Sequence, residues 1–278
     1  MTMVGCYGLS LPAWPDRALM HHADPRWPEL VVEFDGAPTA RPEHTGVSTV
    51  GAEVALIGGH LTMTREPLHA RFLVDAPVTP DAMVHPYLGI AASIANHWLG
   101  RQVFHGGVFV IDGRAWAIVA DKEGGKSSTL AWMSAHGIDV LTDDLVVVDG
   151  GRVLAGPRCV DLREASASAL RMGTMLHIAD GRDRWRVVTE PSVVDAPLAG
   201  WVVPEWGDAI SIEMVPVAER VPLLFGQRSV LSEHSDPTRF LELATLACVR
   251  FTRPHGIESI SASLEALIKA LRQGVSST

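Results

Sequence analysis

Three observations predict an α/β fold for this chain of 278 residues. Short apolar runs between residues 46 and 75 alternate with glycines and polar turns, which predicts a small antiparallel sheet. Two further apolar runs within residues 108–119 indicate a hairpin. A loop containing glycine and lysine and a segment of helical period follow that hairpin directly. We therefore expect a small β-rich domain over residues 1–84 and a larger α/β catalytic domain over residues 85–278.

The N-terminal elements are short, and a proline-rich segment ends them. Pro77–Pro86 contains three prolines, and proline fixes φ and removes a backbone donor, so we expect a break there. Tyr87–Leu99 has apolar residues at helical spacing and predicts a helix packed beneath the core. The expected strands are Leu30–Phe34, Val47–Val50, Glu53–Ile57, His60–Thr64 and Ala70–Val74.

Residues 120–127 match the phosphate-loop pattern G-x-x-x-x-G-K-[ST], with Ala120 in place of the first glycine. Inward-pointing backbone N–H groups of such a loop satisfy polyphosphate oxygens. Lys126 supplies positive charge to the outer phosphates, and Ser127 offers a hydroxyl to Mg²⁺. The helix that follows directs its positive N-terminal end at the same phosphates and ends near His136-Gly137. The residues expected to bind the nucleotide are Asp121, Lys122, Glu123, Gly124, Gly125, Lys126, Ser127 and Ser128.

Asp143 and Asp144 lie between the apolar runs Ile138–Leu141 and Leu145–Val148. Adjacent carboxylates beside dry strands repel each other, so a structural role is unfavourable unless a cation is near. Beside a nucleotide, one carboxylate can hold Mg²⁺ and the other can accept a proton from an attacking hydroxyl. The alternative is a solvated turn before an edge strand. His105, just before the hairpin, is a candidate for the site and for packing alike.

The order of these features resembles the catalytic core of HPr kinase/phosphorylase and its HPr-kinase-like relatives, which is similar to that of phosphoenolpyruvate carboxykinases. The features, specific over residues 105–149, are His105, the Asp112-Gly113 hairpin, the Lys126-Ser127 loop, a helix, a short strand and Asp143-Asp144. The resemblance implies an HPr-kinase-like fold that binds ATP and Mg²⁺. It implies that Lys126 contacts the β- and γ-phosphates and that Ser127 and Asp144 bind the metal. Asp143 would be the general base, although the two aspartates can exchange roles, and His105 would lie beside the γ-phosphate or the acceptor.

The sequence departs from the family's pattern inside the loop. Ala120 replaces the first glycine, and a side chain at a position that needs positive φ is strained. Lys122 and Glu123 replace small residues. Glu123 brings negative charge towards the phosphates unless it points outward or pairs with Lys122. No match is found to the segment that bifunctional members use for phosphorolysis, so the presence of a phosphorylase activity stays open.

The C-terminal half alternates between strands and helices. Gly150-Gly151 predicts a hairpin turn into Val153–Ala155. The charged segment Asp180–Arg186 is expected to be a solvated hairpin tip. The alternative is that Arg184 or Arg186 reaches phosphate, because guanidinium matches phosphate oxygens. The other expected elements are helices at Glu164–Arg171, Pro222–Phe225, Thr238–Val249 and Ile257–Leu271 and strands at Leu198–Val203, Ala209–Val215 and Arg250–Thr252.

Composition argues against several classes of partner. The formal net charge is −9, and no basic stripe is present, which disfavours nucleic acid and anionic membranes as partners. No run approaches the ~20 apolar residues of a membrane span, and the N-terminus lacks the basic segment of a signal peptide. Cys6, Cys159 and Cys248 are far apart and have no metal-site spacing, which favours a reduced, cytoplasmic setting.

The expected reaction is transfer of the γ-phosphoryl group of ATP to a hydroxyl. Members of the resembled family phosphorylate a serine of the carrier protein HPr, a serine of a precursor peptide or small hydroxylated molecules. We favour a Ser or Thr of a peptide or small protein over a small metabolite as the acceptor. Two other classes stay open, a nucleotide-binding module that no longer catalyses and a plain NTPase. The resemblance also implies a homo-oligomer.

Overall fold

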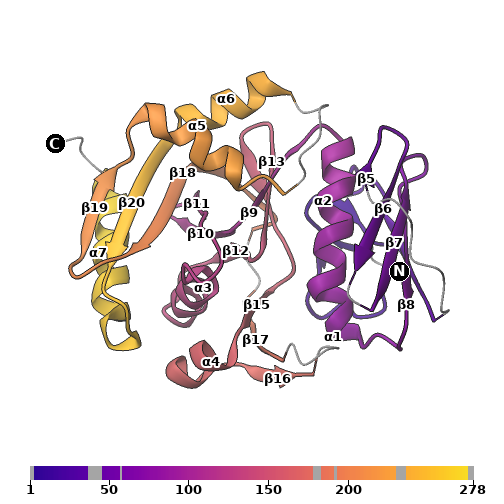
Figure 1. Ribbon diagram of the computed structural model, residues 1–278, viewed down its shortest axis with the longest axis horizontal. Coiled ribbons are helices and arrows are strands. Elements are labelled where there is room, and N and C mark those ends of the chain that lie inside the picture. Colours follow the sequence, from indigo (N-terminus) through magenta and orange to yellow (C-terminus); the bar gives the residue numbers. More distant parts are fainter. Residues whose placement is uncertain are drawn as a thin grey trace.

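The computed structural model describes residues 3–36, 46–56, 58–177, 183–190, 193–229 and 236–274. Within these residues the chain forms a mixed α/β fold with several sheets (Figure 1). Among the described helices, none has the length and apolar character needed to span a membrane.

The N-terminal part of the chain forms two small sheets. Their strands are β1 (Val4–Cys6), β2 (Leu9–Ser10), β3 (His21–His22), β4 (Val31–Asp35), β5 (Gly46–Val47), β6 (Gly51–Leu56), β7 (Gly59–Thr64) and β8 (His69–Val74). The second sheet has the order β4-β8-β7-β6-β5. The predicted strands between residues 30 and 74 are confirmed, except that only Val47 of Val47–Val50 is strand and that Ile57 lies outside the described residues.

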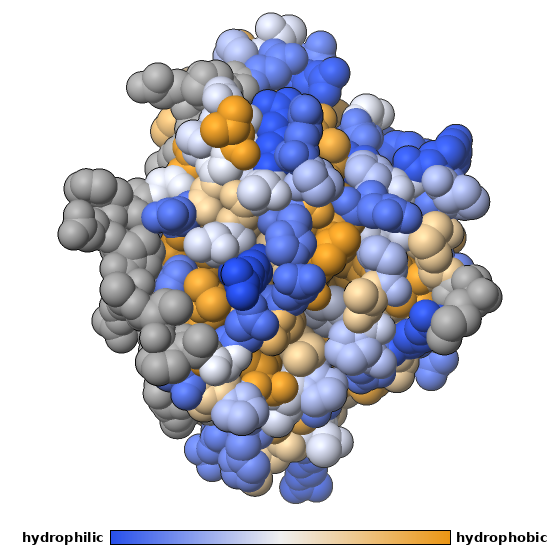
Figure 2. Space-filling view, turned by 90° about the vertical axis from the view of Figure 1, so that its right-hand side faces the viewer, coloured by the Kyte–Doolittle hydropathy of each residue, from blue (hydrophilic) through white to orange (hydrophobic). Residues whose placement is uncertain are grey.

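The β4–β8 sheet is antiparallel except that β4 runs parallel to β8, and it has one covered and one open face. Figure 2 views this side of the molecule, and polar residues dominate it, with apolar residues in small separate groups. On the covered face, Phe72 of β8 packs against Phe34 and Tyr87 with ring centroids 4.9 and 5.2 Å away. The core that these rings begin continues through Leu88 to Val147 of the large sheet.

A helical segment links this sheet to the rest of the chain, and Figure 1 places its main helix between the two. It consists of α1 (Pro80–Ala82), the π-helical turn η1 (Met83–Leu88) and α2 (Gly89–Trp98). The break expected over Pro77–Pro86 is therefore wrong in its extent, because the helix begins at Pro80. Proline is tolerated in a first turn, and Thr79 caps it with its side chain. The helix is interrupted at His85, whose φ of −138° and ψ of 125° are not helical.

The largest sheet has nine strands. They are β9 (Gln102–His105), β10 (Gly107–Ile111), β11 (Arg114–Ile118), β12 (Val140–Thr142), β13 (Leu145–Asp149), β14 (Arg152–Leu154), β18 (Asp195–Trp206), β19 (Ser211–Met214) and β20 (Ala247–Arg253). The hairpin between β10 and β11 is confirmed, with φ of 50° at Asp112 and 74° at Gly113. The hairpin turn at Gly150-Gly151 is also confirmed.

The long strand β18 has different neighbours along its two halves. Residues 195–197 pair antiparallel with β14. Further along, β18 runs parallel to β11 on one side and to β20 on the other. Strands β11, β18 and β20 therefore end at the same edge of the sheet. In α/β proteins ligands bind beyond the carboxyl ends of parallel strands, so this edge is where a site is expected.

Helices cover both faces of these strands (Figure 1). The covering helices are α3 (Lys126–Ala135), α5 (Val217–Gly226), α6 (Pro237–Thr245) and α7 (Ile260–Gln273), which η3 (Ile257–Ser259) precedes. Side chains alternate along β10: Val108 joins the core that includes α5 and α6, and Phe109 joins the core that includes α3 and α7. The predicted helix Thr238–Val249 is too long, because α6 ends at Thr245 and β20 begins at Ala247.

A third small sheet lies below the others in Figure 1. It contains β15 (Cys159–Leu162), β16 (Thr174–Leu176) and β17 (Arg184–Val188), with α4 (Glu164–Leu170) beside it. Residues 180–182 of the predicted charged tip lie outside the described residues, and the rest of it belongs mostly to β17. Arg186 is buried and forms ion pairs with Asp161 at 2.7 Å and Asp81 at 3.1 Å. Arg186 therefore does not belong to a solvated tip, as was expected, and the alternative in which it reaches phosphate is wrong as well, because its partners are acids of the protein.

Candidate functional site

The loop over residues 119–125 connects β11 to α3. Positive φ falls on Glu123 at 70° and on Gly125 at 76°, and Ala120 is not among the positive-φ residues. The backbone strain expected at Ala120 is therefore wrong, because the left-handed positions lie further along the loop. A Cβ on Gly124 would lie 2.7 Å from the Cβ of Ala120. Glycine is required at 124 because the Ala120 side chain occupies that space.

Lys126 and Ser127 open α3 next to this loop. Lys126 Nζ donates to the carbonyl oxygens of Ala120 at 2.6 Å and Asp121 at 3.2 Å. Desolvation lowers the pKa of Lys126, and the charges of nearby aspartates oppose that effect. Ser127 Oγ donates to Asp143 Oδ1 at 3.3 Å. The first N–H groups of a helix lack intrahelical partners, so the start of α3 presents backbone donors, an ammonium and a hydroxyl together.

Asp143 and Asp144 form the turn between β12 and β13. The backbone of Asp144 has a φ of 70°, a conformation in which Asp is enriched. Its N–H donates to Asp143 Oδ1 at 2.9 Å. Desolvation, followed by the negative charge of Asp144, raises the pKa of Asp143 to about 7, against the opposing effect of the Ser127 hydrogen bond. A carboxyl that titrates near neutral pH is suited to accept a proton from a reacting group.

Two histidines flank Asp144. His105 Nδ1 lies 3.3 Å from Asp144 Oδ1, and His85 Nδ1 lies 3.5 Å from Oδ2. His105 ends β9, opposite Leu145 in register, and desolvation lowers its pKa against the opposing charge of Asp144. His85 is not among the predicted site residues, because it lies inside the segment where the prolines predict a break. The interruption of the helix at His85 is a local feature that no periodicity marks.

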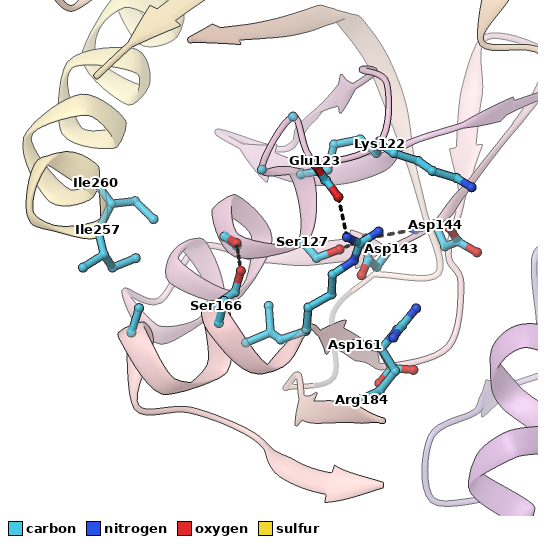
Figure 3. A pocket seen from close by; sticks show the side chains of 18 of the residues that line it. Lys122, Glu123, Ser127, Asp143, Asp144, Asp161, Ser166, Arg184, Ile257 and Ile260 are labelled. Atoms are coloured by element: carbon cyan, nitrogen blue, oxygen red, sulfur yellow. Dashed lines mark hydrogen bonds and ion pairs between the residues drawn. The ribbon is translucent and has the colours of Figure 1, made fainter. Parts of the chain in front are cut away.

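These side chains line a single cavity of about 640 Å³ (Figure 3). Of the predicted residues, Asp121 alone is not part of its lining, and its carboxylate accepts a hydrogen bond from Gln227 at 3.1 Å. Figure 3 shows Ile257 and Ile260 at the far side of α3 from Asp144, so the cavity has a polar and an apolar end. The predicted residues that line it are His105, Lys122, Glu123, Gly124, Gly125, Lys126, Ser127, Ser128, Asp143 and Asp144.

The acidic side chain of Glu123 pairs with an arginine outside the loop. Arg163 Nη1 lies 2.7 Å from Glu123 Oε1, so the alternative pairing with Lys122 is wrong. Trp206 Nε1 donates to the backbone oxygen of Glu123 at 3.3 Å. Arg184, one of the two arginines considered from the sequence, lines the cavity (Figure 3). These contacts join residues that are more than 35 positions apart, and the sequence pattern contains no signal for them.

The donor set fits a polyphosphate and Mg²⁺. Within the part of the chain that the structure describes, no cluster of three or more His, Cys, Asp or Glu side chains is arranged to hold a metal ion. Mg²⁺ in nucleotide sites keeps several waters and takes only one or two carboxylates plus phosphate oxygens. Ser127 Oγ and the acid pair match that partial set. The cavity also falls in the usual range for small-ligand pockets, about 300–1,000 Å³.

Comparisons with known proteins add little to this geometry. No protein-family model matches the chain, and no curated protein sequence matches it. Among solved structures, the HPr(Ser) kinase/phosphatase from Coxiella burnetii is similar at 9% sequence identity, over 62% of this chain and 98% of that one. The TM-score is 0.29, and a likeness at that level carries no argument about fold or chemistry.

Proposed function

We propose that this chain is a kinase with an HPr-kinase-like P-loop core, which transfers the γ-phosphoryl group of ATP to a hydroxyl. One observation carries the proposal. Lys126 and Ser127 at the start of α3 line the same cavity as the acid pair in the turn between β12 and β13, Asp143 and Asp144. Ser127 Oγ lies 3.3 Å from Asp143 Oδ1. Phosphoryl transfer requires cationic groups, a metal site and an acceptor base in one place.

The roles follow from the chemistry of each group. Loop amides and Lys126 would hold the β- and γ-phosphates, with the ammonium exchanging loop carbonyls for phosphate oxygens. Ser127 and Asp144 would hold Mg²⁺, which neutralises charge on the phosphates when bound. Asp143 would take the proton of the acceptor hydroxyl, since its pKa is raised to about 7. His105 and His85 would orient Asp144.

The acceptor is proposed from the sequence resemblance over residues 105–149. A Ser or Thr of a peptide or small protein is the favoured acceptor, and a small hydroxylated metabolite is the alternative. The nucleobase is proposed to bind at the apolar end of the cavity, at Ile257 and Ile260. Ligand pockets are lined mainly by apolar side chains with a few polar contacts. The acceptor would then enter from the polar end, beside Asp144.

Incubation with Mg²⁺ and ATP labelled at the γ-position tests the proposal. We expect a screen of acceptors to yield a labelled peptide or metabolite. Lys126→Ala should abolish this labelling while the protein stays folded. Nucleotide binding without any labelled product would favour a non-catalytic nucleotide-binding module. Release of labelled phosphate in the absence of any acceptor would favour a plain NTPase. Transfer that persists unchanged in Lys126→Ala would reject the site.

A further inference from the structure

Arg253 is buried, and its guanidinium has no acidic partner among the residues that the structure describes. The residue ends β20 and is 3% exposed. Within the described chain, its guanidinium makes one hydrogen bond, from Nη2 to the Gly125 carbonyl oxygen at 3.3 Å, and its Nε is buried without a partner. Desolvation lowers its pKa to about 10. A buried cation without a counter-charge is unfavourable to folding.

Aromatic rings hold this guanidinium in position. Its Cζ lies 4.7 Å from the centroid of the Trp206 ring and 5.6 Å from that of Phe251. Trp206 ends β18 directly opposite Arg253 in the parallel ladder, and His255 packs on Trp206 at 4.7 Å. Cation–π contacts attract a guanidinium but bring no net negative charge. The rings therefore fix the position of Arg253 and leave its charge uncompensated.

The guanidinium lies against the loop at the start of α3. A Cβ on Gly125 would overlap Nη2 of Arg253. Glycine at 125 therefore allows both the backbone φ of 76° and the close contact with the arginine. Both residues line the cavity with Lys126 and Ser127. Arg163, the other arginine beside the loop, is already paired with Glu123 at 2.7 Å. Arg253 thus adds an unpaired cation to the place where the first amides of α3 converge.

We propose that Arg253 is an anion-binding residue of this cavity, and that its guanidinium binds phosphate oxygens of the polyphosphate that the 119–125 loop and α3 receive. This inference rests on the proposed nucleotide-binding function of the loop. Guanidinium groups donate two parallel hydrogen bonds to phosphate. The ligand supplies the negative charge that Arg253 lacks among its described neighbours. The unpaired charge therefore lowers the stability of the free protein and raises its affinity for the ligand.

Arg253→Met tests this with two measurements that should move in opposite directions. Inorganic tripolyphosphate is the probe, titrated calorimetrically with Mg²⁺ into the full-length protein. We expect the affinity to fall about tenfold or more, since a charge-assisted bidentate contact is lost. We expect the Tm of the ligand-free variant to equal or exceed that of the wild type, because an unpaired buried charge is removed.

Arg220→Met is the matched control. Arg220 is also buried, but its guanidinium donates to the carbonyl oxygens of Val215 at 2.9 Å and Leu246 at 3.0 Å. Its removal should lower the Tm and leave the tripolyphosphate affinity unchanged. Arg253→Lys keeps the charge, so it should lose affinity less than Arg253→Met and serves if the methionine variant does not fold.

The outcomes separate this inference from the proposed kinase activity. Tripolyphosphate affinity within twofold of wild type in a folded Arg253→Met protein overturns the anion-binding role, even if phosphoryl transfer is found. A lower Tm together with unchanged affinity overturns it as well and assigns Arg253 to structure. If the wild-type protein transfers no phosphate but Arg253→Met still lowers the tripolyphosphate affinity, the anion site is supported and the kinase activity is rejected.

Discussion

The Ser127 hydroxyl donates a hydrogen bond of 3.3 Å to the Asp143 carboxylate, across 16 residues of sequence. Sheet pairing explains the contact. The start of β10 pairs with Ile118 at the end of β11 on one side and with Thr142 at the end of β12 on the other. The segments that follow both strands therefore leave the sheet at the same edge. The loop that leads to Ser127 and the turn that holds Asp143 meet there as a consequence.

Lys126→Ala is expected to lower phosphoryl transfer by about 10³-fold or more, because one preorganised cation at the transferring group is lost. The Tm should change little, since the Nζ contacts only two carbonyl oxygens of the loop. Transfer of labelled phosphate and thermal unfolding check the two parts. Lys269→Ala, which removes an exposed lysine of α7, should change neither quantity. Equal loss in both variants would contradict the role of Lys126.

Asp143→Asn is expected to remove the pH dependence of transfer around neutrality. The raised pKa of about 7 means that the wild-type rate should increase as the pH rises through 7, while the carboxylate becomes available as a base. The asparagine variant should be about 10²- to 10⁴-fold slower, with no such rise. A pH–rate profile from pH 5.5 to 9 measures both. A wild-type profile that stays flat over this range would show that Asp143 is not the base.

The same substitution is expected to stabilise the protein at alkaline pH. Folding raises the pKa of Asp143 from 3.8 to about 7. An acid shifted upward binds its proton more tightly in the folded state, so its penalty is absent below pH 3.8 and complete above about pH 7. Asp143→Asn should raise the free energy of unfolding by up to about 4 kcal/mol at pH 8, since each unit of pKa shift corresponds to about 1.4 kcal/mol. Urea unfolding should show that gain shrinking towards pH 4, and a gain that is equal at both pH values would contradict it.

His85→Ala and His105→Ala are each expected to weaken the response to Mg²⁺. The two rings lie 3.5 and 3.3 Å from different oxygens of Asp144. Partners of a metal-binding carboxylate typically contribute about 10- to 100-fold to metal affinity. The Mg²⁺ concentration for half-maximal transfer should therefore rise about tenfold in each variant. His22→Ala, an exposed histidine of β3, is the control. If both variants keep the Mg²⁺ dependence of the wild type, Asp144 is not a metal ligand that these histidines orient.

The Glu123–Arg163 pair is expected to tune nucleotide affinity without affecting stability. Both side chains are mostly exposed, so their removal should cost less than about 1 kcal/mol of stability. Arg163→Ala leaves a free carboxylate at the loop and should weaken ATP binding several-fold, as like charges approach. Glu123→Ala in the same protein should restore it. Isothermal titration of the two single variants and the double variant measures the coupling, and additive effects would mean that the pair does not matter.

The sequence predicted the parts of the site that local patterns encode. The turn at Asp112-Gly113, the loop before Lys126 and the helix after it each have a signal of their own in composition and period. The placement of Asp143 beside Ser127 was expected from the chemistry of the carboxylate pair and from the resemblance, and it requires the pairing of β10 with two strands. Short-range signals determine each element, and sheet register determines which elements meet.

Other parts of the structure had no such signal. Arg253 reaches Gly125 over 128 positions because β20 runs parallel to β18 and places Arg253 opposite Trp206. The boundary between α6 and β20 was misplaced because the first residues of β20, Ala247–Val249, are apolar and continue the pattern of α6. A short apolar run does not distinguish a strand from a helix. The φ angles of the loop depend on its turn geometry, so the strain predicted at Ala120 falls instead on Glu123.

A crystal structure of the protein with Mg²⁺ and a non-hydrolysable ATP analogue tests the central claim most directly. We expect β- and γ-phosphate oxygens within hydrogen-bond distance of Lys126 Nζ and of the amides of Gly125 and Lys126. We also expect the metal between Ser127 Oγ and a carboxylate of the Asp143-Asp144 pair. A nucleotide bound elsewhere, with Lys126 Nζ still on the carbonyl oxygen of Ala120, would contradict this claim.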